Sequence, residues 1–146
     1  MDFFEYRQSL GERADEETER LATQVIGAAI EVHSRLSAGL PESCYQKAME
    51  HELGLRGIPF VPQASVPVIY KGAPVGEGFC DLLVGGRLVV ELKSVDRLAD
   101  VHRSQVVAYL SALNLRLGLL INFNVPSLKS GLKRVVNDPR SSSPSC

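Results

Sequence analysis

Three charged side chains near the middle of the chain have the types needed for metal-assisted hydrolysis: Asp81, Glu91 and Lys93. Two carboxylates on neighbouring strands can share one divalent cation, because side chains directly opposite each other have Cβ atoms about 4.5–5.5 Å apart. Mg²⁺ prefers oxygen ligands and typically takes only one or two carboxylates. An ammonium beside them could orient an activated water or offset charge in a transition state. The alternative, a partly exposed ionic cluster of little consequence, stays open on residue types alone.

Polar side chains also occur at helical spacing on either side of this group. Gln105 and Tyr109 lie four positions apart, so an amide and a phenol would project from one face of a helix. Glu42 and Tyr45 lie one turn apart in an earlier segment. Each pair by itself is equally typical of ordinary structure, in which a tyrosine packs its ring and a glutamate favours the first turn of a helix.

Whether the charged residues converge depends on the turn that joins two predicted strands at residues 85–87. With a two-residue loop, Asp81 would face Val90 and Glu91 would lie on the opposite side of the hairpin. With a three-residue loop, or a bulge of equal effect, Asp81 stands across from Glu91. The second register also places five apolar residues on one face of the hairpin: Leu82, Val84, Leu88, Val90 and Leu92. Because a register is strongly specified where one face must be buried, we predict the second register.

The elements that must position these residues follow from apolar periodicity and from turn residues. Apolar residues recur at helical spacing over residues 18–36, and Pro41 suits the first position of a second helix that runs to Leu53. Asp100 can cap a third helix. Pro67 indicates that the first strand lies at a sheet edge. Runs rich in valine, leucine and other apolar residues predict five strands, at residues 64–70, 75–84, 87–93, 118–123 and 132–136.

Length and composition predict one globular domain. The chain has 146 residues, of which 45% are hydrophobic and 23% charged, and this apolar content argues against disorder. Residues 1–17 form a polar N-terminal segment without a clear period, and the domain is expected over residues 18–136. The serine- and proline-containing end, residues 137–146, is predicted to be a disordered tail.

Charge and cysteine content limit the classes of partner and compartment. Residues 1–60 hold 11 acidic and 6 basic side chains, a net −5, whereas residues 61–146 hold 6 and 10, a net +4. The second half could face an anion, although ordinary surface solubility explains this excess equally well. No apolar stretch of about 18 residues and no secretion signal is evident, and three cysteines fit neither a disulfide framework nor a zinc site. We therefore expect a cytoplasmic protein without a membrane partner.

The motifs taken together resemble a known family. Residues 39–45, then Asp81, then residues 91–93, then residues 105–109 resemble the GxxExxY family of the PD-(D/E)XK nuclease superfamily, in that order along the chain. The resemblance covers roughly residues 20–136. One departure is that Cys80, in place of a proline, precedes the first acid.

The resemblance implies a restriction-endonuclease-like α/β (α+β) fold with an αβββαβ core, in which helices flank a mixed central sheet. Asp81 and Glu91 would bind Mg²⁺ or Mn²⁺ with help from the peptide carbonyl of Leu92. Glu42 matches the superfamily's helical acid, which completes the metal shell or holds a water. Lys93 matches the lysine assigned to water activation.

The same resemblance implies that Gln105 and Tyr109, together with Tyr45, contact nucleic acid. The leading hypothesis is a metal-dependent nuclease that hydrolyses phosphodiester bonds, with DNA ahead of RNA as the substrate. The rival hypothesis is a catalytically silent module of the same fold that binds nucleic acid or a protein partner. It has indirect support because a net charge of −1 provides little cation density for phosphate. A homodimer that enlarges the binding surface stays open.

Overall fold

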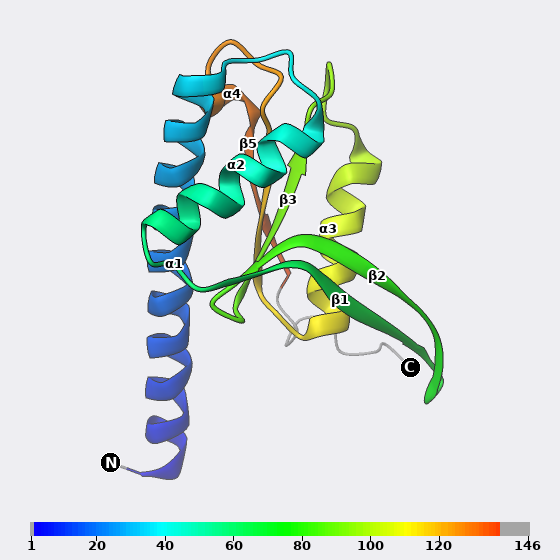
Figure 1. Cartoon of the computed structure of the whole chain (residues 1–146). Coiled ribbons are helices and arrows are strands. Elements are labelled where there is room, and N and C mark those ends of the chain that lie inside the picture. Colours follow the sequence, from blue (N-terminus) through cyan, green and yellow to red (C-terminus); the bar gives the residue numbers. More distant parts are fainter. Residues whose placement is uncertain (1, 138–146) are drawn as a thin grey trace.

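A five-stranded mixed sheet forms the centre of the protein, and helices cover both of its faces (Figure 1). The computed structural model describes residues 2–137, apart from the side chains of residues 6–14. Only the β3–β4 pair is parallel among the described strands; the other neighbours are antiparallel. The strands, in their order across the sheet, are β1 Phe60–Tyr70, β2 Ala73–Val84, β3 Leu88–Lys93, β4 Leu117–Asn122 and β5 Leu132–Val136.

Two hydrophobic cores form, one on each face of the sheet. Helices α1 (Phe3–Leu36) and α2 (Glu42–Leu55) cover one face, and α3 (Asp100–Leu113) covers the other. The short helix α4 (Leu128–Gly131) connects β4 to β5. The strand β4 lies between the two cores and is buried along its whole length, as its almost entirely apolar sequence requires. This arrangement confirms the predicted fold class.

The hairpin between β2 and β3 has the predicted register. Leu83 pairs with Val89, and a three-residue loop, residues 85–87, joins the strands. Gly85 and Gly86 both have left-handed backbone conformations, with φ of 59° and 69°, which glycine adopts at little cost. The five residues of the predicted apolar face all belong to the core beneath α1 and α2. Burial of that face therefore sets the register, as expected.

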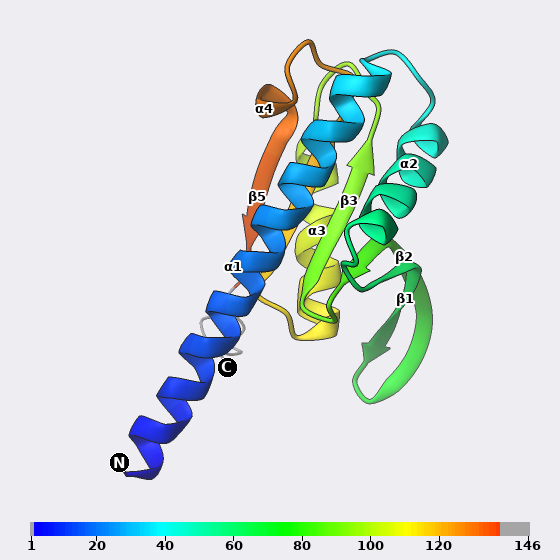
Figure 2. The same cartoon turned by 60° about the vertical axis from the view of Figure 1, so that its left-hand side comes forward.

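The first helix is longer than its apolar period predicts, because it begins at Phe3 instead of at residue 18. A capping box between Asp2 and Glu5 stabilises its start, where the Glu5 amide donates to Asp2 Oδ1 at 2.8 Å. Figure 2 shows that this end of α1 extends beyond the sheet. The sequence of this part of the helix has no clear apolar period, so periodicity could not reveal it.

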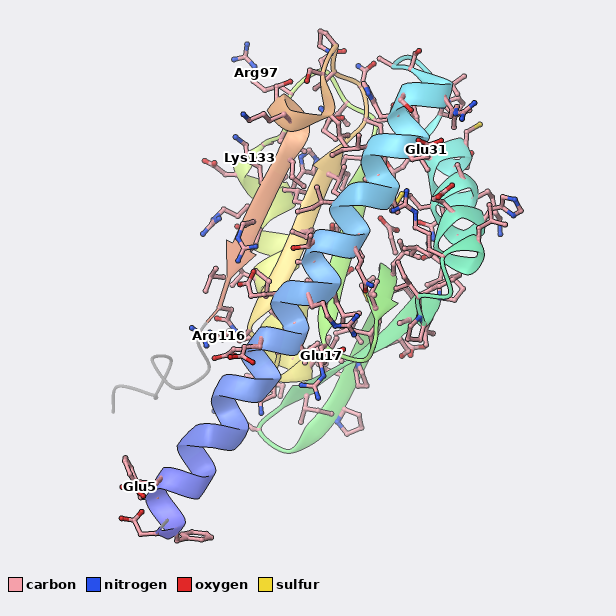
Figure 3. The ribbon with its side chains drawn as sticks, turned by 90° about the vertical axis from the view of Figure 1, so that its left-hand side faces the viewer. Glu5, Glu17, Glu31, Arg97, Arg116 and Lys133 are labelled. Atoms are coloured by element: carbon pink, nitrogen blue, oxygen red, sulfur yellow. The ribbon has the colours of Figure 1, made fainter. Side chains whose placement is uncertain are left out.

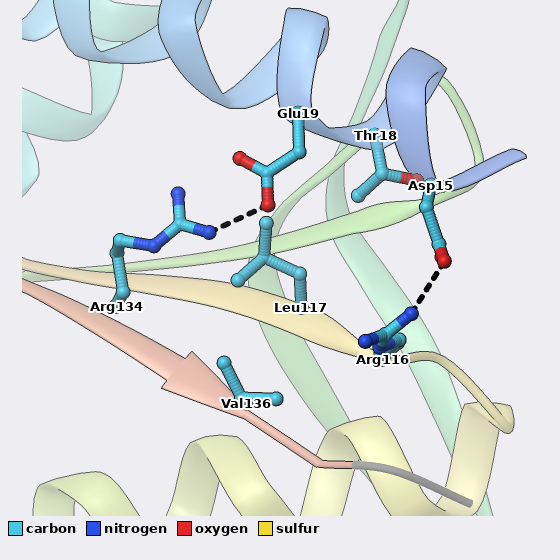
Figure 4. A pocket seen from close by; sticks show the side chains of 7 residues that line it. All are labelled: Asp15, Thr18, Glu19, Arg116, Leu117, Arg134 and Val136. Carbon is cyan, nitrogen blue, oxygen red and sulfur yellow. Dashed lines mark hydrogen bonds and ion pairs between the residues drawn. The ribbon is translucent and has the colours of Figure 1, made fainter. Parts of the chain in front are cut away.

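Two ion pairs attach the middle of α1 to the far end of the sheet. Asp15 pairs with Arg116, and Glu19 pairs with Arg134 on β5 (Figure 4). Figure 3 shows Arg116 beside α1, well along the helix from Glu5 at its projecting end. The pocket between these elements is lined by the two ion pairs and contains none of the predicted site residues. These contacts join part of the segment 1–17 to the domain.

Two predicted helix starts are wrong by one residue, and the predicted edge strand is confirmed. Pro41 is the N-cap of α2 with an extended backbone, ψ 150°, and is not its first helical residue; Ala99, one residue before Asp100, is the N-cap of α3. The edge position predicted from Pro67 is confirmed, since β1 is the outermost strand. The predicted disordered tail lies outside the described residues, except for Asn137. No helix in the described part of the chain is both long and apolar enough to span a membrane.

Candidate active site

Asp81 and Glu91 meet where strands β2 and β3 separate. The backbone ladder between these strands is continuous from Val84 to Leu82 and then stops. Beyond it, the side chains take over: the Asp81 amide donates to Glu91 Oε1 at 2.8 Å, and the Leu92 amide donates to Asp81 Oδ2 at 2.8 Å. Each carboxylate thus accepts a hydrogen bond from the opposite strand. The predicted convergence of the two acids is confirmed.

The ladder stops because β1 and β2 change faces at this point. Leu82 belongs to the core beneath α1 and α2, whereas Cys80 belongs to the core beneath α3, although residues two apart in a regular strand share a face. The change requires a local turn of both strands about Asp81. Figure 1 shows the resulting bend, with the β1–β2 hairpin curving away from β3. The bend opens the sheet edge of β3 at the position of Glu91.

Burial disfavours two unneutralised negative charges on the acid pair. Glu91 is 2% exposed, and desolvation, with the nearby Asp81 charge, raises the pKa of Glu91 to about 8. The Asp81 amide and the Lys93 ammonium act in the opposite direction. A buried carboxylate in this state takes up a proton or a cation, and perturbed pKa values of this kind are common at functional sites. The pair therefore fits a divalent cation.

Glu42 and Lys93 lie within electrostatic reach of the pair. Partial burial raises the pKa of Glu42, and the Asp81 charge raises it further. The Lys93 ammonium and His102 lower this pKa. Lys93 is half-buried and forms no ion pair within 4.0 Å among the described residues, so its charge acts on both glutamates from a greater distance. These charge interactions place the first turn of α2 and the end of β3 on the side of the acid pair from which Glu42 and Lys93 act.

Helix α3 brings Tyr109 to the other side of the acid pair. Gln105 Nε2 donates to the Tyr109 hydroxyl at 3.3 Å, so the predicted amide–phenol face is confirmed. Burial raises the pKa of Tyr109, and the Glu91 charge raises it further. The ring packs on the backbone of β2 at Gly78, where an added Cβ would lie 2.8 Å from Tyr109 Cε1. The absence of a side chain at Gly78 therefore lets the phenol approach the site.

Tyr45 does not lie in the site, contrary to the expected contact with nucleic acid. Its ring is fully buried and stacks on Phe123 with centroids 4.6 Å apart. Its hydroxyl donates to the Ser37 carbonyl at 2.6 Å and accepts from the Leu40 amide at 3.2 Å. Because the ring is packed in the core and the hydroxyl forms two backbone hydrogen bonds, Tyr45 holds the loop before α2 in place. Tyr45 thereby helps to place Glu42 and is not available to a substrate.

Two glutamines that sequence reasoning missed also hold Asp81. Gln46 Nε2 donates to the Asp81 carbonyl at 3.0 Å, and Gln63 Nε2 donates to Asp81 Oδ1 at 3.3 Å. Gln46 lies four residues after Glu42 on the same face of α2, which is a spacing that could have drawn attention to it. Gln63 follows no such pattern, because its contact arises from the bend between β1 and β2.

The donor set for a metal ion is small. Within the described residues, no group of three or more histidine, cysteine, aspartate or glutamate side chains is arranged to hold a metal. Two carboxylates suffice for Mg²⁺, which commonly keeps several waters. Cys80, beside the acids, does not add a thiolate, since burial and the Glu91 charge raise its pKa to about 11.

A mixed sheet with flanking helices and an acid pair at its opened edge define a nuclease-like α+β domain. The chain belongs to the PD-(D/E)XK nuclease superfamily, whose family model matches residues 19–135. The predicted superfamily is thus confirmed, and its members generally use divalent metals. Membership of the GxxExxY family stays a prediction. Neither a curated protein nor a solved structure gives a significant match.

Proposed function

We propose that the protein is a nuclease that hydrolyses phosphodiester bonds of nucleic acid with the help of Mg²⁺ or Mn²⁺. The observation that carries this proposal is the acid pair at the end of the β2–β3 ladder, where Glu91 is buried against Asp81 and its pKa is raised to about 8. Superfamily membership supports the proposal. A structural ion pair would place an acid beside a base, whereas this site places two acids together.

Asp81 and Glu91 would hold the metal ion, with Glu42 and the Leu92 carbonyl as further oxygen donors. The Leu92 amide points toward Asp81, and in a strand the carbonyl of a residue points to the same side as its amide. The Leu92 carbonyl therefore faces the opening between β2 and β3. A divalent ion bound there would lower the pKa of a water molecule and stabilise charge that develops on the phosphate.

The remaining residues would orient the water and the substrate. Lys93 carries a half-buried ammonium near both Glu42 and Glu91, where it can orient the attacking water or offset transition-state charge. Tyr109 and Gln105, both half-buried, present a phenol and an amide that can hydrogen-bond a phosphate or a sugar. We propose DNA ahead of RNA as the substrate.

The experiment measures Mn²⁺ binding by calorimetry and cleavage of a panel of DNA and RNA substrates with Mg²⁺, Mn²⁺ or EDTA. We expect Mn²⁺ binding in the wild type, loss of binding and cleavage in Asp81→Asn, and loss of cleavage with retained binding in Lys93→Met. Lys129→Met, at an exposed lysine on α4, is the matched control and should cleave like the wild type. Unchanged cleavage by Asp81→Asn would refute the proposal.

A catalytically silent binding module is the second candidate. The observation that favours it is that both carboxylates already accept backbone hydrogen bonds, which gives them a role in joining β2 to β3 without any metal. In that case, the wild type would bind nucleic acid in a salt-sensitive manner and form no products with any metal. Asp81→Asn would then lose stability instead of activity.

A further inference from the structure

The Asp81 carboxylate is held from two sides by two different strands. Gln63 on β1 donates to Oδ1 at 3.3 Å, and the Leu92 amide on β3 donates to Oδ2 at 2.8 Å. Gln63 is exposed and Asp81 is half-buried, so the amide lies on the solvent side of the carboxylate. With one donor on each oxygen, rotation of the carboxylate about its Cβ–Cγ bond is restricted.

The backbone of Gln63 is itself unusual. Its φ is +47°, a left-handed conformation that residues other than glycine seldom adopt, and such outliers cluster at functional sites. The flanking pairs of the β1–β2 ladder, Pro62 with Leu82 and Ala64 with Cys80, are regular, and the position of Gln63 between them is not paired. The irregularity therefore falls opposite Asp81, where the strands change faces.

We propose that Gln63 is a positioning residue of the candidate active site. Its amide holds the Asp81 carboxylate in the orientation in which the free lone pairs of the carboxylate serve a cation shared with Glu91. This inference rests on the proposed function. Partners that orient a metal-binding carboxylate affect metal affinity or activity by about 10–100-fold, and the 3.3 Å bond of an exposed amide places Gln63 at the lower end of that range.

Gln63→Gly separates this role from a purely structural one. Glycine accepts a φ of +47° without strain, so the variant loses the amide while the backbone keeps its conformation. If the only role of Gln63 were to adopt this backbone conformation, the variant would keep the Mn²⁺ affinity of the wild type. Asn114→Gly is the matched control, because Asn114 is also exposed, also has a left-handed φ of +55°, and lies at the C-terminal end of α3.

The experiment compares the wild type, Gln63→Gly and Asn114→Gly as full chains. Calorimetry measures the Mn²⁺ dissociation constant, thermal unfolding in EDTA measures stability, and a nuclease assay gives kcat and KM. For Gln63→Gly we expect Mn²⁺ binding weakened about 10-fold, kcat lowered by a similar factor, KM for nucleic acid unchanged, and a melting temperature in EDTA no lower than that of the wild type. Asn114→Gly should match the wild type in metal binding and in kcat.

Each contrary outcome is distinguishable. Wild-type Mn²⁺ affinity in Gln63→Gly would overturn the positioning role and leave the proposed nuclease intact. A lower melting temperature of Gln63→Gly in EDTA, combined with wild-type Mn²⁺ affinity, would assign Gln63 to folding alone and would also overturn the inference. A wild type that binds no Mn²⁺ would overturn the proposed function, and the role of Gln63 with it.

Discussion

Replacement of Glu91 by glutamine should stabilise the metal-free protein, although Glu91 is a buried and hydrogen-bonded residue. The pKa of Glu91 rises from an ordinary value of 4.5 to about 8 on folding, first through burial and then through the Asp81 charge. The folded state therefore binds more protons than the unfolded state between these pH values. Stability contributed by the protonated acid is fully present below pH 4.5 and is lost as the pH rises through 8.

The size of the effect follows from the same shift. At about 1.36 kcal/mol per pKa unit, a rise from 4.5 to about 8 corresponds to at most about 5 kcal/mol. Relaxation and water entry at the opened end of the ladder reduce this limit, and we expect roughly 2–3 kcal/mol. Glutamine keeps an oxygen that accepts from the Asp81 amide, and its own amide group can donate to the Asp81 carboxylate. The variant thus loses the buried charge and retains the hydrogen bonds.

Urea unfolding between pH 5 and pH 8.5 in EDTA measures this difference directly. The free energy of unfolding of Glu91→Gln, relative to the wild type, should rise across this range by roughly 2–3 kcal/mol. Glu16→Gln, at an exposed glutamate on α1, is the control and should follow the wild type. Saturating Mn²⁺ should stabilise the wild type and not Glu91→Gln, which would reverse the order. A Glu91→Gln variant that is less stable than the wild type at pH 8.5 in EDTA would refute the electrostatic reasoning.

Three further predictions concern the surroundings of the site. Tyr45→Phe should lower the free energy of unfolding by about 1–2 kcal/mol, measured by urea unfolding, because the ring stays in the core while two hydroxyl hydrogen bonds are lost. Gly78→Ala should displace Tyr109 and cost about 1–3 kcal/mol with reduced cleavage, whereas an unchanged melting temperature would argue against that contact. Cys80, with a pKa of about 11, should resist alkylation in the native protein at pH 8 and react after unfolding, as peptide mass mapping would show.

The register of the central hairpin was predictable because it is a matter of burial. Only a three-residue loop places Leu82, Val90 and their neighbours on one apolar face, and the structure has that loop. The same register brings Asp81 and Glu91 together, so the apolar pattern also predicted the position of the acid pair. Helical spacing likewise predicted the contact between Gln105 and Tyr109.

Features that depend on contacts between distant segments were not predictable. Tyr45 matches a functional motif, yet its ring fills a space beside Phe123, which lies far along the chain. The start of α1 extends beyond the sheet and its sequence has no clear apolar period, so periodicity gave no sign of this part of the helix. Gln63 reaches Asp81 only because two strands bend together, and a left-handed glutamine has no signature in its own sequence neighbourhood.

Amino-acid patterns alone predicted the order of the strands and of the three long helices, the buried face of the hairpin and the identity of the acid pair, because periodicity and burial act along each segment; the short helix α4 was not predicted. Packing between distant segments sets the other features: the ladder between β2 and β3 ends at these acids, Glu91 is withdrawn from water, and Gln46 and Gln63 hold Asp81. These features arise where β2 leaves one core for the other. Such a crossing depends on the packing of both cores at once, and no single segment encodes it.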